Sequence, residues 1–184
     1  MRNPDLDLAT RHRYGDSRAF EEVYERYGGM IFNLALRMTG DVEEAADLCQ
    51  ETFLKIHRHL GGFRGRSALR TWVYCVAVNC CRSRFRRQKN RRQHMMEPSP
   101  EGLEDLPDPR RGPEERTISR DTRDRVAAAL EQLPPIYREV VLLRDLEGLT
   151  YREISRVLGV RLGTVRSRLA RGRDRLRELL ENGP

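Results

Sequence analysis

The chain has 184 residues, which is enough for one compact domain or two small ones. Hydrophobic residues make up 38% of it and charged residues 34%, and this balance favours small helical bundles over one deep β-sandwich core. The formal net charge of +7 favours a polyanionic partner, nucleic acid before an anionic membrane surface.

The first half of the chain is predicted to contain three amphipathic helices. Apolar residues recur at three- and four-residue steps over about residues 16–38, which marks one buried helix face. Asp41 is placed to cap the next helix, and Gly61-Gly62 ends it. After a short basic loop, Ser67 can cap a third helix. Because the connections are short, we expect a compact helical domain over residues 10–93.

The third helix continues into a block of basic residues, and the chain then changes character. Seven arginine and lysine residues lie between Arg82 and Gln93 with no acidic residue among them. Residues 97–113 contain five of the nine prolines together with several acidic residues, so no helix can run through them. We therefore expect an acidic, proline-rich, flexible linker over residues 94–119.

A helix-turn-helix is predicted near the C-terminus, within a second domain over residues 120–182. Thr150 and Glu153 have the spacing of a capping box, which marks a helix start. Gly159 can adopt the left-handed conformation that ends this helix, and the next helix is expected to start near Thr164. The predicted fold class is therefore all-α, with two small helical domains joined by a flexible linker.

The outward positions of the second helix are rich in arginine. The N-terminal residues of a recognition helix contact base edges in the major groove, and later residues lie near phosphates. Arginine can also bond bidentately to guanine. The expected DNA contacts are Arg161, Thr164, Arg166, Ser167, Arg168, Arg171, Arg173 and Arg175. The competing interpretation is a helical hairpin with merely solvated arginines, but the helix-turn-helix spacing favours DNA binding.

The cysteines and histidines do not form a metal-binding pattern. The four cysteines contain no C-x-x-C, and the four histidines do not complete a zinc finger. Buried thiols acting as small hydrophobic groups are favoured over a metal or redox site, so we expect no cofactor and no metal. The sequence has no run of roughly 20 apolar residues and no signal-peptide core, so we expect a cytoplasmic protein with reduced thiols.

Several segments together resemble one known family. Thr150-Tyr151-Arg152-Glu153-Ile154, with the Gly163-Thr164-Val165-Arg166-Ser167 run after it, resembles region four of the sigma-70 family, in its extracytoplasmic-function branch. Residues 36–55 resemble the part of region two that binds the RNA polymerase clamp. Residues 63–79 resemble the segment of region two that reads the minus-ten promoter element. Because these segments occur in the family's order, the chain is identified as an extracytoplasmic-function sigma factor.

The resemblance implies a function and a set of partners. The protein would be a non-enzymatic sigma factor that binds the clamp helices and flap of core RNA polymerase and promoter DNA. It would be regulated by an anti-sigma factor and would have no small-molecule substrate. Region two would open the minus-ten element, and region four would read the minus-thirty-five element. The alternative is a helix-turn-helix regulator that acts as a dimer without replacing the sigma subunit.

The resemblance also assigns residues to these contacts. The loop 63–68 would hold a base flipped out of the non-template strand, and Asn79 would contact bases near it. The minus-ten contacts are Phe63, Arg64, Ser67, Trp72, Asn79, Arg82 and Arg86. The polymerase contacts are Asp47, Leu48, Gln50, Glu51, Phe53, Leu54 and Lys55.

Overall fold

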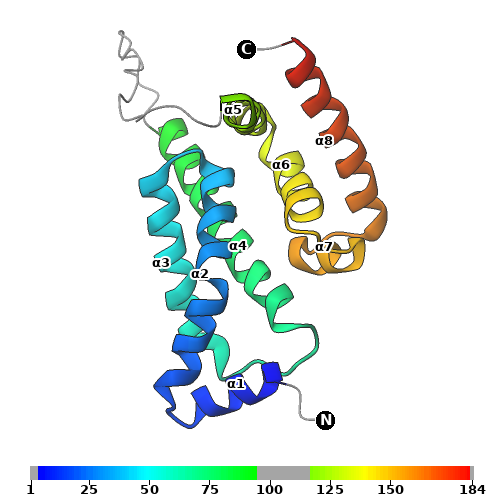
Figure 1. The fold of residues 1–184 in the computed structure, drawn as a ribbon. Helices are drawn as coiled ribbons and strands as arrows, with labels where there is room; N and C mark the ends of the chain where they lie inside the picture. Colours follow the sequence, from blue (N-terminus) through cyan, green and yellow to red (C-terminus); the bar gives the residue numbers. More distant parts are fainter. Residues whose placement is uncertain (1–3, 95–116, 183–184) are drawn as a thin grey trace.

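The computed structural model describes residues 4–94 and 117–182, and these residues form helices in two groups (Figure 1). No strand occurs within these two ranges. The predicted fold class, all-α with two helical domains and a C-terminal helix-turn-helix, is confirmed. Most of the expected linker, residues 95–116, lies outside the described residues, and the proposed domain boundaries stay predictions. In the same two ranges, no helix is long and apolar enough to cross a membrane.

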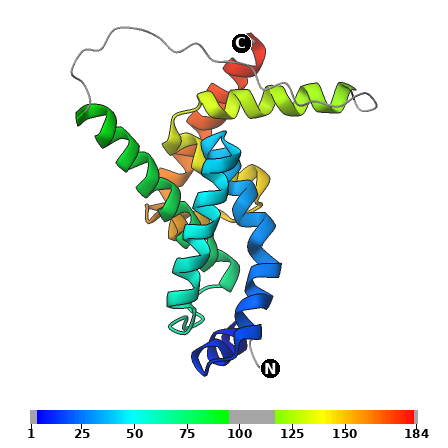
Figure 2. The same ribbon diagram turned by 90° about the vertical axis from the view of Figure 1, so that its left-hand side faces the viewer.

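The N-terminal group is a three-helix bundle with a short helix across one end (Figures 1 and 2). The bundle contains α2 (Ser17–Thr39), α3 (Val42–Leu60) and α4 (Leu69–His94), and α1 (Pro4–Arg13) lies across its lower end in Figure 1. The sequence prediction did not include α1. Helices α2 and α3 begin and end where caps and glycines indicate, whereas α4 begins at Leu69, two residues after the predicted cap Ser67. Asp41 accepts a hydrogen bond from the Glu44 amide and begins α3, as predicted.

The C-terminal group contains a continuous core beneath the helix-turn-helix. It consists of α5 (Thr117–Gln132), α6 (Pro135–Val141), the π-helical turn η1 (Leu142–Leu146), α7 (Tyr151–Leu158) and α8 (Leu162–Asn182). The π turn follows α6 directly, and the Glu147 amide donates to the Leu142 carbonyl five residues earlier. The recognition helix α8 begins two residues before the predicted start at Thr164.

The helix-turn-helix has the local geometry that the sequence predicts. The Thr150 side chain accepts from the Glu153 amide, and the Glu153 carboxylate accepts from the Thr150 amide at 2.8 Å, so both bonds of the capping box form. Hydrogen bonds from the Thr150 hydroxyl and amide hold the pKa of Glu153 below its ordinary value. Gly159 ends α7 with φ +64°, and the Ser155 hydroxyl donates to the Val160 carbonyl at 2.6 Å across the turn.

The recognition helix crosses α6 at a glycine. A Cβ atom added at Gly172 would lie 2.9 Å from Val141 Cγ2 and 3.3 Å from Tyr137 Cβ. Only a residue without a side chain therefore allows α8 to approach α6 this closely.

Replacing Gly172 by alanine should destabilise the protein by about 1–3 kcal/mol, because the added methyl group overpacks the contact between α8 and α6. Urea unfolding followed by circular dichroism measures this change. Gly163→Ala, on the same helix, is the matched control because nothing lies within 4 Å of its added Cβ. That control should be neutral or slightly stabilising. Equal stability of the two variants would contradict the close contact at Gly172.

Candidate nucleic-acid interface and docking groove

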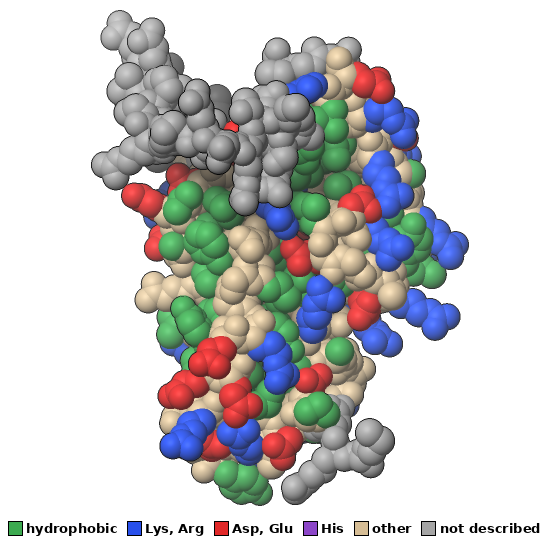
Figure 3. Space-filling model, in the orientation of Figure 1, with side chains coloured by type: hydrophobic (Ala, Val, Ile, Leu, Met, Phe, Trp, Pro, Cys, Tyr) green, Lys and Arg blue, Asp and Glu red, His purple; other side chains and the backbone are tan. Residues whose placement is uncertain are grey.

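Basic side chains gather along the outer face of α8 (Figure 3). Arg161, Arg166 and Arg171 are exposed, as is Ser167, whose hydroxyl donates to the Thr164 carbonyl at 3.1 Å. Their backbone is fixed by the capped turn before them and by the buried Val165 and Leu169 on the opposite face. The start of the helix therefore presents arginines to solvent from a rigid support.

Three of the predicted phosphate contacts have partners within the protein. Arg173 forms a bidentate ion pair with Asp145, and the Arg175 guanidinium lies 5.2 Å from the centre of the Tyr137 ring. Arg168 lies 3.6 Å from the carboxylate of Glu139. These arginines are held in place by the domain itself.

A cleft beside the start of α8 adds residues that sequence reasoning missed. It has a volume of about 420 Å³, and Arg144 and Arg152 line it together with the predicted Arg166. The Arg144 guanidinium donates to the Leu149 carbonyl at 2.9 Å and lies 5.1 Å from the centre of the Tyr151 ring. No periodic signal marks Arg144, because it lies in the π turn before the motif.

The predicted minus-ten residues lie along α4 and in the loop before it. Arg64 and Asn79 are exposed, and Ser67 is half-buried. Phe63 is 6% exposed, and the centre of its ring lies 5.8 Å from that of the half-buried Trp72. The structure therefore places Phe63 as a support under the loop, with its ring turned inward.

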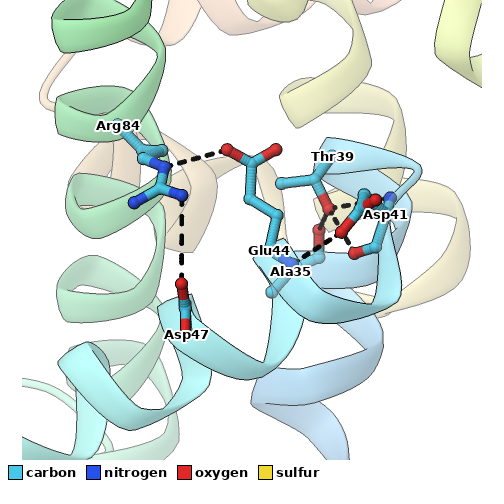
Figure 4. Close-up of polar contacts among 6 residues, drawn as sticks. All are labelled: Ala35, Thr39, Asp41, Glu44, Asp47 and Arg84. Carbon is cyan, nitrogen blue, oxygen red and sulfur yellow. Dashed lines mark hydrogen bonds and ion pairs between the residues drawn. The ribbon is translucent and has the colours of Figure 1, made fainter.

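The basic part of α4 is paired with acidic residues on α3. Arg84 bonds to Glu44 at 2.9 Å and lies 3.9 Å from Asp47, as Figure 4 shows. Arg87 lies 3.5 Å from Glu51 in the same row. Arg86, a predicted minus-ten contact, is exposed.

The predicted polymerase contacts divide between surface and core. Asp47, Gln50 and Leu54 are exposed. Glu51 and Lys55 are half-buried and form an ion pair at 2.7 Å, which holds the pKa of Glu51 below its ordinary value. Leu48 and Phe53 are buried, at 1% and 6% exposed. The Leu48 side chain fills the core under α3, and its role as a polymerase contact stays a prediction.

An apolar groove runs between α2 and α3. Its volume is about 550 Å³, and it is lined mainly by aromatic and aliphatic side chains. Tyr24 and Leu54 stand at the groove with 55% and 52% of their surfaces exposed, and the rings of Tyr24 and Phe53 are 4.6 Å apart. The sequence assigned only the α3 side of this groove. The contribution of Tyr24 was missed because its helical phase had marked it as part of a buried face.

The two helical groups pack against each other through α4 and α7 (Figure 1). Arg82 on α4 donates to both carboxylate oxygens of Glu139 on α6, at 2.8 and 2.6 Å. The Glu139 side chain is only 3% exposed, and Arg168 is its second cationic neighbour. Arg82 was predicted to contact minus-ten DNA, but in this arrangement its guanidinium faces the other domain.

Further polar contacts surround this ion pair. The Tyr74 hydroxyl donates to the Glu147 carboxylate, and Arg70 donates to the Glu147 carbonyl at 2.7 Å. Burial raises the pKa of Tyr74, and its bond to the carboxylate raises it further. Arg138 donates to the Met38 carbonyl at the C-terminus of α2. The interface therefore links α4, which carries several of the predicted minus-ten contacts, to the residues around the helix-turn-helix.

The four cysteines are free thiols. Cys80 and Cys81 are buried, and Cys49 and Cys75 are half-buried, as expected for small hydrophobic groups. Burial raises the pKa of the Cys81 thiol to about 12, so this thiol stays protonated at neutral pH. Within residues 4–94 and 117–182, no group of three histidine, cysteine or acidic side chains could hold a metal ion.

Comparison with known proteins gives a consistent result for both halves of the chain. The family model for sigma-70 region 2 matches residues 23–91, and that for sigma-70 region 4 matches residues 123–176. The chain is 35% identical to the RNA polymerase sigma-H factor of Pseudomonas aeruginosa, over 96% of this chain and 94% of that one. It is also 35% identical to the ECF RNA polymerase sigma factor SigM of Mycobacterium tuberculosis, over 96% and 84%.

Solved structures share the fold. CnrH, in complex with the cytosolic domain of CnrY, superposes with a TM-score of 0.71 at 24% identity, over 99% of this chain and all of that one. The sigma factor RpoE of Bartonella quintana, in complex with the anti-sigma factor NepR, gives a TM-score of 0.68 at 24% identity, over 88% and 96%.

The chain belongs to the sigma-70 family of RNA polymerase sigma factors, in the extracytoplasmic-function branch. It is a polymerase-binding factor of promoter-specific transcription initiation, and sigma factors are non-enzymatic. The match over region 2 also favours this function over that of a dimeric helix-turn-helix regulator, which would need no such domain.

Replacing Glu139 by glutamine should expand the free protein. The change leaves Arg82 and Arg168 without their shared carboxylate, and removing one partner of a buried ion pair costs about 3–5 kcal/mol. Small-angle X-ray scattering should therefore report a larger radius of gyration. Glu178→Gln, an exposed position on α8, should leave the scattering curve unchanged. An unchanged curve for Glu139→Gln as well would show that the ion pair does not hold the domains together.

Proposed function

We propose that the two domains hold a promoter at two points. The start of α8 reads the duplex of the minus-thirty-five element, and the loop before α4, together with Asn79, captures a base of the minus-ten element. The observation that carries the proposal is the row of exposed arginines on α8 beside the arginine-lined cleft. Exposed arginines suit guanine edges, and the cleft suits a phosphate. Core polymerase supplies the chemistry, and we place this action in the cytoplasm.

The minus-ten proposal rests on the exposure of Asn79 and of the loop. Flipping a base out of a duplex costs a few kcal/mol, which hydrogen bonds to its Watson–Crick edge can offset. Asparagine offers both a donor and an acceptor, and Asn79 is exposed. Arg64 in the loop and Arg86 further along α4 are also exposed and can contact phosphates.

The groove between α2 and α3 is our proposed docking site for the clamp helices of core polymerase. A helix packs well into an apolar groove when aromatic and aliphatic side chains line it. Tyr24, Phe53 and Leu54 supply that lining, and Gln50 supplies a polar edge. The flap of the polymerase is proposed to contact the C-terminal domain.

Promoter binding requires the two domains to separate. Arg82 cannot contact a phosphate while it donates twice to the buried Glu139 and once to the Leu158 carbonyl. We propose that polymerase binding opens the interface, and that an anti-sigma factor opposes this step. The two structural relatives, one of them bound to a named anti-sigma factor, support the second part.

Run-off transcription with reconstituted core polymerase, on the promoter of its own operon, tests the function as a whole.

Asn79→Ala should reduce the rate of promoter opening by about tenfold while leaving the affinity for core polymerase unchanged, because two base-directed hydrogen bonds are lost. Permanganate footprinting measures opening. Asn90→Ala, at an exposed position further along the same helix, is the control. Normal opening by Asn79→Ala would disprove the assignment of this residue.

Leu54→Asp should weaken binding to core polymerase by at least tenfold, because it places a charge in the apolar groove. Fluorescence anisotropy of labelled core polymerase measures the affinity. Val42→Asp is the matched control, since Val42 is 62% exposed on the same helix and lies outside the groove. If both variants bind equally well, the groove is not the docking site.

A further inference from the structure

The first helix of the protein contacts the loop that precedes α4. Helix α1 lies across the end of the bundle, outside the region that the sigma-70 region 2 family model matches, since that match begins at residue 23. Leu8 and Ala9 are 3% and 1% exposed and anchor the helix in the core. Three other side chains of α1 contact the loop over residues 61–68 or the residue that follows it.

The first contact is at the C-terminal end of the loop. The Asp5 carboxylate accepts a hydrogen bond from the Leu69 amide at 2.8 Å, where α4 begins. The first amides of a helix have no partner within it, and a negative charge near them is favourable. Asp5 thus performs, from another helix, the capping role that the sequence assigns to Ser67. Its carboxylate also lies 3.8 Å from Arg26, which orients it.

The second contact is at the middle of the loop. Gly65 has φ +67°, and a Cβ atom added to it would lie 3.0 Å from Leu6 Cδ2. Leu6 therefore packs directly on the backbone of the loop. Its side chain remains 36% exposed, so its packing here is not that of an ordinary core residue.

The third contact is at the start of the loop. Arg13 donates from Nε to the Gly61 carbonyl at 2.6 Å, and a ring nitrogen of His12 lies 2.8 Å from the His57 carbonyl. These carbonyls are at the C-terminal end of α3, where helices leave acceptors without partners. Helix α1 thus contacts the start, the middle and the end of one loop.

We infer that α1 is a positioning element for minus-ten recognition, with Asp5 and Leu6 as its positioning residues. The inference rests on the proposed role of the loop in base capture. A loop that is already in its binding conformation captures a base without first being ordered, and the apparent affinity scales with the fraction of molecules in that conformation. Neither residue contacts the base itself.

The test uses holoenzyme assembled with core polymerase and single-stranded DNA from the non-template minus-ten region of its own operon's promoter. A second set of oligonucleotides carries an abasic site at each position in turn. Wild-type holoenzyme should bind the intact strand more tightly than the strand that is abasic at the captured position. The ratio of the affinity for the intact strand to that for the abasic strand should fall by about threefold to tenfold in Asp5→Ala, the effect expected for loss of a helix cap. Leu6→Ala should lower the same ratio, because the loop loses the side chain that packs on Gly65.

Two further variants separate positioning from general stability. Asp5→Asn keeps an oxygen that can accept from the Leu69 amide, so it should recover most of the ratio. Asp7→Ala removes the same charge two residues along α1, and within the described part of the chain Asp7 makes no hydrogen bond or ion pair that links it to the loop. For Asp7→Ala, the ratio of the affinities for the intact and abasic strands should therefore equal that of the wild type. Affinity for core polymerase should be the same for all of these proteins.

The outcomes are distinguishable. If wild-type holoenzyme does not prefer the intact strand over the abasic strand at any position, the proposal that the loop captures a base is wrong. The inferred role of α1 is then wrong as well. If the wild type shows the preference and both Asp5→Ala and Leu6→Ala retain it, only the inference about α1 is wrong. Equal weakening of binding to intact and abasic strands would also overturn it, because α1 would then affect the whole domain and not the captured base.

Discussion

One buried carboxylate joins the two halves of the protein. Glu139 is almost fully removed from water between Arg82 of the first domain and Arg168 of the recognition helix. A buried ion pair contributes little net stability, because the cost of desolvation offsets the attraction, but removing one partner is strongly unfavourable. The interface is therefore either intact with its charges paired or open with all three charges in water. Such an interface favours two distinct states over a continuum of partly separated ones.

Much of the fold could be predicted from the sequence because its signals are local. The capping box at Thr150, the cap at Asp41 and the glycine at Gly159 act through neighbouring residues, so short patterns suffice to place helix ends. Helix α1 could not be placed in this way. It has only ten residues, and it is stabilised by Leu8 and Ala9 in the core and by contacts to a loop about 60 residues away in the chain. These are tertiary effects.

The sequence predicted where the candidate site lies more accurately than it predicted what surrounds each of its side chains. Helical phase identified which arginines of α8 face outward, but outward can mean toward solvent, as for Arg166, or toward another element, as for Arg173. The same limit explains Arg82, whose partner is 57 residues away on α6. It also applies to the buried Leu48, because a resemblance transfers a stretch of helix and cannot separate its inner face from its outer one.

The π turn after α6 sets the direction of the side chains at its end. One extra residue in a helical turn rotates the next positions by about 100° relative to an uninterrupted α-helix. From this turn, Asp145 reaches Arg173 within its own domain, and Glu147, just beyond it, reaches Tyr74 in the other. Deleting a single residue here would restore an ordinary helix and point these carboxylates elsewhere. The spacing of residues in one short turn thus determines which partners Asp145 and Glu147 can reach.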